Sequence, residues 1–149
     1  MDQRLIVTAA LVAHLVAGAM LGLAASVADV PYSVGQVEFL VIVGYVTPLA
    51  GLGLVWARSY VYGAVLLTCS AIANGWFVAH FGFVGPSPTN VAAVDGSASA
   101  AYLYATVAVF LASLVLAGTG AWLWYRESEG FRTVVHDFVR PPGNDGTRD

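Results

Sequence analysis

The stretch "LIVTAALVAHLVAGAMLGLAASVA", residues 5–28, decides the fold, because it is apolar and contains no Asp, Glu, Lys or Arg. A helix needs roughly 20 such residues to cross the hydrocarbon core of a bilayer. Three further apolar runs follow, at about 37–57, 60–84 and 100–125. Lipid offers the backbone no hydrogen bonds, so each run is predicted to be a helix. The sequence therefore predicts an all-α fold, an integral membrane four-helix bundle over residues 1–125.

Composition supports lipid as the main solvent of the chain. Hydrophobic residues make up 58% of the sequence and charged residues 10%, and the mean hydropathy is +0.76. Soluble domains have about 45–50% apolar and about 25% charged residues. The net charge of −3 argues against nucleic acid as a partner, because phosphate binding needs clustered positive charge. Cys69 is the single cysteine; it excludes an internal disulfide and is predicted to be a small core residue.

The arginines predict the orientation of the bundle. Arg4 precedes the first run and Arg58 separates the second from the third. Four more follow the last run: Arg126, Arg132, Arg140 and Arg148. The connections 29–36 and 85–99 contain no Lys or Arg. Positive residues collect on the cytoplasmic side of membrane proteins, so we predict a multi-pass protein of the cell membrane with both termini in the cytoplasm.

The first run admits an alternative in which residues 1–28 are a cleaved signal peptide. Ser26 and Ala28 are small residues of the kind found at signal-peptidase sites. The apolar run is longer than the roughly 7–15 residues usual in signal peptides, and Asp2 lies beside Arg4 in its leading segment. We therefore expect the first helix to be retained.

Residues 126–149 are predicted to form a cytoplasmic tail with an amphipathic helix at about 130–140. Its apolar residues follow helical spacing on one stripe: Phe131, Val134, Val135, Phe138 and Val139. Pro141 and Pro142 are expected to end it. The stripe is too short to span, so we expect it to lie along the membrane surface or on a partner.

Two features of the spans predict local geometry. "SVGQ", residues 33–36, is typical of a capping box at the start of the second helix. Pro48 lies midway along that helix and predicts a kink or a local unwinding. Gly18 and Gly22 form a small-residue face that allows another helix to approach, within the bundle or in a homo-oligomer.

Polar residues at membrane depth are costly and are therefore candidates for function. His14, Ser70 and Asn74 are predicted near the middle of their helices as a candidate intramembrane relay or ligand set. We expect His14 to hydrogen-bond Ser70, Thr47 or Ser113. That bond could be structural, or it could belong to a proton relay or a cofactor ligand.

A second group is predicted near the opposite end of the spans. Glu38 and His80 fall at about the same depth, where a carboxylate could hold the imidazole in one tautomer. With Asn90 and Asp95 they could line an outward-facing polar pocket. Alternatively, His80 is an interfacial residue whose tip reaches water, and Glu38 is an acid favoured by the helix dipole.

The sequence contains no catalytic or metal-binding motif such as a phosphate-binding loop, a His-Glu zinc motif or Cys-x-x-Cys. Two histidines can ligate one haem only at nearly one depth. His14 and His80 differ by about 17 Å along the membrane normal, at a rise of about 1.5 Å per residue. We therefore predict no cofactor, and the alternative left open is a haem held by one histidine or shared with another subunit.

Four features follow one another along residues 10–125. They are His14 in the first run, "TPLAGLGLVW" at 47–56, "AHF" at 79–81, and a proline-containing loop that ends in "TNV" at 89–91. In this order the chain resembles a group of small four-span membrane proteins of haloarchaea and some bacteria. Members of that group tend to carry a further acid or histidine in the loop, where this chain has Asn90. The group has no assigned activity, so the resemblance implies a topology.

The short, charge-poor connections leave little room for an active site outside the membrane. We expect a non-enzymatic accessory or interaction subunit of a membrane assembly. Its partners would be the lipid bilayer and other membrane subunits or further copies of itself. The alternatives are a haem- or other cofactor-binding redox protein, and a small oligomeric transporter or pore with the Pro48 region as its flexible element.

Overall fold

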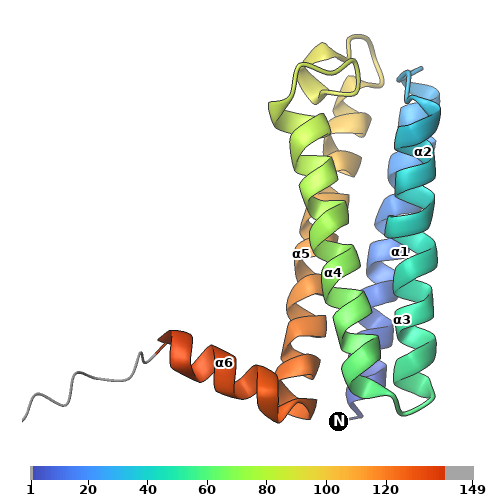
Figure 1. Cartoon of the computed structure of the whole chain (residues 1–149). Helices are drawn as coiled ribbons and strands as arrows, with labels where there is room; N and C mark the ends of the chain where they lie inside the picture. The colour runs from blue at the N-terminus through green and yellow to red at the C-terminus, as the bar shows by residue number, and fades with distance from the viewer. Residues whose placement is uncertain (1, 140–149) are drawn as a thin grey trace, which may run out of the picture.

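The computed structural model describes residues 2–139, and within them every regular element is a helix (Figure 1). The elements are α1 (Gln3–Val27), α2 (Val34–Val41), η1 (Ile42–Val46), α3 (Thr47–Trp56), α4 (Tyr60–Ala79), η2 (His80–Val84), η3 (Val91–Ala93), α5 (Ser99–Glu127) and α6 (Glu129–Val139). Four helices are long and apolar enough to cross a membrane: Gln3–Val27, Val34–Trp56, Tyr60–Val84 and Ser99–Glu127. The predicted all-α chain with four helices of spanning length is confirmed.

Local signals in the sequence set the helix ends. The Asp2 side chain accepts a hydrogen bond from the Arg4 backbone N–H and caps α1. The predicted capping box is present: Ser33 and Gln36 exchange side-chain and backbone hydrogen bonds. It starts α2 at Val34, three residues before the predicted beginning of the second span.

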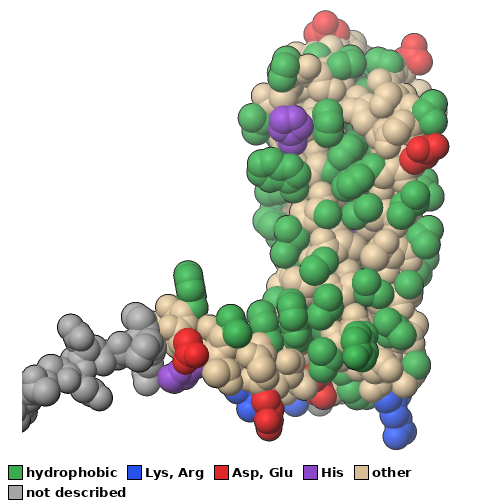
Figure 2. Space-filling view, in the orientation of Figure 1, with side chains coloured by type: hydrophobic (Ala, Val, Ile, Leu, Met, Phe, Trp, Pro, Cys, Tyr) green, Lys and Arg blue, Asp and Glu red, His purple; other side chains and the backbone are tan. Residues whose placement is uncertain are grey.

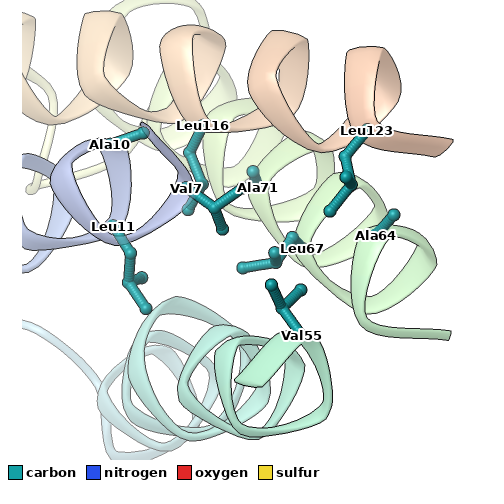
Figure 3. Packing of buried hydrophobic residues seen from close by; sticks show 9 residues of the cluster. All are labelled: Val7, Ala10, Leu11, Val55, Ala64, Leu67, Ala71, Leu116 and Leu123. Carbon is teal, nitrogen blue, oxygen red and sulfur yellow. The ribbon is translucent and has the colours of Figure 1, made fainter. Parts of the chain in front are cut away.

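The arginines among residues 2–139 lie at one end of the bundle. This end is at the bottom of Figure 2, where the blue side chains gather. We call it the arginine end. Near it lies a buried core cluster with members from all four spans (Figure 3): Val7, Ala10, Leu11, Val55, Ala64, Leu67, Ala71, Leu116 and Leu123. Lipid is as apolar as leucine, so in a bilayer close packing rather than removal from water would hold such a core together.

Glycines bring two helix backbones into contact in this half. A Cβ atom added to Gly63 in α4 would lie 2.7 Å from the backbone oxygen of Gly51 in α3. It would also lie 2.7 Å from Cγ2 of Val55. The second span is therefore held tightly against α4 near the arginine end, by the small-residue packing common in membranes.

The other half of the bundle is packed differently. Its core cluster comes from α1, α4 and α5: Ala17, Leu21, Ala25, Phe77, Val78, Tyr102, Ala105 and Val109. Within residues 2–139, α2 contributes no buried residue. Phe39 reaches this core only from its edge, where its ring stacks on Phe77 with 4.8 Å between centroids. The second span is thus pinned at one end and loosely attached at the other.

The local unwinding predicted around Pro48 takes the form of the π-helix η1, directly before the proline. Pro48 has no N–H, so the carbonyl of Gly44 loses the donor it would have in an α-helix. The Thr47 N–H bonds the Ile42 carbonyl five residues earlier, and the Thr47 hydroxyl donates to the same oxygen at 2.8 Å. This wider turn absorbs the proline without breaking the helix.

Helix α6 turns away from the bundle at the arginine end (Figure 1). Phe131 stacks on Trp124 at 4.1 Å between ring centroids, which fixes the start of α6 on α5. Val134 and Phe138 are 64% and 88% exposed. Apolar side chains project from α6 toward the side occupied by the bundle, and acidic groups lie on the opposite side (Figure 2). The predicted tail helix matches Glu129–Val139; Arg140, Pro141, Pro142 and Arg148 lie outside the described residues.

Candidate binding site

A cavity of about 410 Å³ opens between α1 and the α2–η1 part of the second span. Ligand-binding pockets in proteins commonly have volumes of about 300–1,000 Å³. Its walls are mainly apolar, from Leu21 and Ala25 on α1 and from Leu40 and Val41 on α2. It lies in the half of the bundle where α2 is loosely attached.

A tyrosine and two glycines account for this space. The phenol of Tyr45 in η1 lies against Gly18 so closely that a Cβ atom there would collide with its hydroxyl. The ring therefore packs directly against the α1 backbone at this level. One turn further along, Gly22 lines the cavity, and a Cβ atom added to it would meet no described atom within 4 Å. The predicted small-residue face therefore packs inside the bundle at Gly18 and leaves a recess at Gly22.

The rim of the cavity lies within the spans. Gly22 and Ser26 on α1 are exposed lining residues, and so are Val37 and Val41 on α2. All four belong to helices of membrane-spanning length. An opening between such helices faces lipid when the bundle is in a bilayer.

A buried polar cluster forms the base of the cavity. His14 is 3% exposed, and its Nε2 lies 3.1 Å from the Gly44 carbonyl oxygen. A carbonyl only accepts hydrogen bonds, so Nε2 carries the proton. Gly44 is the residue whose α-helical donor is missing because of Pro48. The histidine on α1 thus supplies the hydrogen bond that the proline on the second span removes.

Ser113 on α5 joins His14 to Asn74 on α4. The Ser113 hydroxyl donates to the Val109 carbonyl at 2.8 Å and accepts from Asn74 Nδ2 at 3.1 Å. His14 Nδ1 lies 3.5 Å from the same hydroxyl oxygen. This network fixes the Asn74 amide with its NH₂ group toward Ser113. Asn74 Oδ1 is buried without a hydrogen-bond partner among the described residues.

The structure brings together two of the three residues predicted as an intramembrane set. His14 and Asn74 both approach Ser113, one of the expected partners of the histidine. The Ser113 proton goes to the Val109 carbonyl, so His14 Nδ1 is a neighbour of that hydroxyl and receives no proton from it. Ser70 instead donates to the Leu67 carbonyl of its own helix at 3.2 Å. The Gly44 carbonyl was not predicted as a partner. The feature of the sequence that indicates this partner is Pro48, four residues after Gly44.

The four residues of the predicted polar pocket make no hydrogen bond or ion pair with one another in the part of the chain that the structure describes. Glu38 and His80 are both exposed, and no hydrogen bond or ion pair joins them within residues 2–139. The His80 ring packs edge-on against Phe81, with 4.9 Å between centroids. Asn90 bonds its own loop, because its Nδ2 donates to the Gly85 carbonyl and its Oδ1 accepts from the Ala92 N–H. Asp95 is exposed in the same connection.

Two bonded tyrosines lie at the end of the bundle far from the arginines, where one of them lines the cavity. Tyr102 donates to the Thr89 carbonyl at 2.7 Å, so Tyr32 is the donor in the 2.9 Å bond between the two hydroxyls. Burial, helped by the bond to Tyr102, raises the pKa of Tyr32 well above its usual range. Tyr32 also lines the cavity. This pair ties the connection after α1 to α5, a contact that sequence analysis did not predict.

No family model, no curated protein and no solved structure matches this chain. The functional argument therefore rests on the geometry of the cavity and of the polar cluster at its base.

Proposed function

We propose that this chain is a non-enzymatic, multi-pass protein of the cell membrane that binds an apolar molecule from the bilayer in the cavity between α1 and α2. The observation that carries the proposal is the cavity itself. It has the volume of a ligand site, about 410 Å³, its walls are mainly apolar, and its rim belongs to membrane-spanning helices. As an accessory subunit of a membrane assembly, the chain would hold this molecule for its partners.

The proposed orientation places the arginine end and both termini in the cytoplasm. Arginine is absent from the two connections at the other end, which contain Asp29 and Asp95. This asymmetry is the usual sign of a cytoplasmic side. With α6 at the arginine end, its exposed stripe would lie along the inner membrane surface. The cavity would then open into the outer half of the bilayer.

Binding in this cavity would depend on shape more than on removal from water. A bilayer molecule is already in an apolar solvent. The favourable free energy of its binding would therefore come from close packing against the walls and from hydrogen bonds. The recess at Gly22 and the Tyr45 ring packed on Gly18 provide that shape.

A pair of matched substitutions tests the proposal. Gly22→Leu fills the recess, whereas Gly53→Leu adds the same side chain to an exposed position on α3; neither new Cβ atom meets a described atom within 4 Å. The full chain, reconstituted in lipid nanodiscs, is photolabelled with an alkyl diazirine, and the labelled peptides are identified by mass spectrometry. We expect labelling of α1 and α2 in the native chain and in Gly53→Leu, and its loss in Gly22→Leu. Equal labelling of all three proteins would contradict the proposal.

A further inference from the structure

One buried polar atom in the cavity lacks a partner. Asn74 is 2% exposed, and its Oδ1 has no donor within hydrogen-bond distance among residues 2–139. Buried polar groups in folded proteins are almost always hydrogen-bonded, and an exception calls for an explanation. In the hydrocarbon region of a bilayer there is no bulk water to donate a hydrogen bond to such an atom.

We infer that the molecule bound in this cavity is a membrane-soluble alcohol whose hydroxyl donates a hydrogen bond to Asn74 Oδ1. The inference rests on the proposed function, because it names the chemistry of the ligand for the same cavity. The hydroxyl would lie at the base of the cavity, and the apolar body would extend along Leu21 and Leu40 toward the rim.

The surrounding contacts leave hydrogen-bond acceptors at the bottom of the cavity. Ser113 gives its proton to the Val109 carbonyl at 2.8 Å, so it must receive one from the Asn74 amide, which turns Oδ1 away. His14 Nε2 donates to Gly44, so Nδ1 of the neutral ring is a second acceptor at the same level. Two acceptors favour a ligand with an O–H group over one with only ether or carbonyl oxygens.

The Gly44 backbone lies close beside the buried Oδ1. A Cβ atom added to Gly44 would lie 3.0 Å from that oxygen. Glycine thus keeps a methyl group away from the acceptor, on the wall that the second span gives to the cavity. Gly44→Ala would crowd Oδ1 without removing the Asn74 amide or its bond to Ser113.

The test compares two probes of equal chain length, of which only one has an O–H donor. Dodecanol and undecyl methyl ether compete with the alkyl diazirine for the cavity of the full chain in nanodiscs. One neutral hydrogen bond corresponds to about a fivefold difference in affinity. We expect the native chain to bind the alcohol about fivefold more tightly than the ether. Asn74→Leu should bind both equally, at the ether affinity of the native chain.

Gly44→Ala provides a second variant should Asn74→Leu fail to fold, as judged by gel filtration. It should lose the preference for the alcohol while keeping the fold. Equal affinities for the two probes in the native chain would overturn the inference, and so would a preference that persists in both variants. If neither probe displaces the diazirine from the native chain, the proposed function fails as well. If both displace it equally, only the hydroxyl assignment fails.

Discussion

His14 and Pro48 are expected to be energetically coupled through one carbonyl oxygen. Replacing His14 by Leu removes the 3.1 Å bond from Nε2 to the Gly44 carbonyl. Pro48 offers no N–H to replace it, so the carbonyl of the buried Gly44 loses the side-chain donor that the structure gives it. An unsatisfied buried group costs about 1–3 kcal/mol, but polar bonds between membrane helices average only about 0.6 kcal/mol. We therefore expect His14→Leu to lower the free energy of unfolding by about 1–2 kcal/mol.

Pro48→Ala should relieve this cost because it restores a backbone donor four residues after Gly44. In that background we expect His14→Leu to cost about 1 kcal/mol less, which is a coupling between residues on different helices. The free energies of the four proteins are measured by reversible denaturation in mixed micelles. Ser70→Ala serves as the control, since its hydroxyl bonds only its own helix. An equal cost of His14→Leu in both backgrounds would refute the role given to the carbonyl.

Three further predictions concern other parts of the bundle. Gly63→Ala should destabilise the bundle by about 1–3 kcal/mol through overpacking against Gly51. Gly53→Ala, at an exposed position, should not destabilise it. The melting temperatures of the two variants and of the native chain test this prediction. The pKa of Tyr32 is raised in the fold by burial and by its hydrogen bond. The stabilisation that the neutral phenol gives the folded state is therefore complete below about pH 10 and is lost as the pH rises above that value. Tyr32→Phe should therefore show a smaller alkaline loss of melting temperature than the native chain. His80→Ala should leave the melting temperature unchanged within error, because the side chain is exposed; a clear drop would show that its aromatic contacts matter.

Position along the helix axis could be predicted from the sequence, whereas direction around the axis could not. His14 and Asn74 were expected near the middle of their helices, because the rise per residue fixes that position, and the structure places both beside Ser113. Cys69 was predicted to be a core residue, and this is wrong, because the structure exposes it. Its neighbours Thr68 and Ser70 face the interior instead. When a helix is apolar on all sides, its sequence does not indicate which side faces the core, because lipid and core favour the same residues.

By itself, the sequence determined that the chain is helical, where the four long helices begin and end to within a few residues, and where the second span deviates from α-geometry. These follow from local rules: apolar length, the Ser33 capping box and the missing N–H of Pro48. Only the tertiary structure decided that Gly63 meets Gly51 and that Tyr45 packs on Gly18. Only it buried Asn74 Oδ1 without a partner among residues 2–139. Such contacts depend on how each helix is rotated about its axis, and that rotation is set by close packing between segments far apart in the chain.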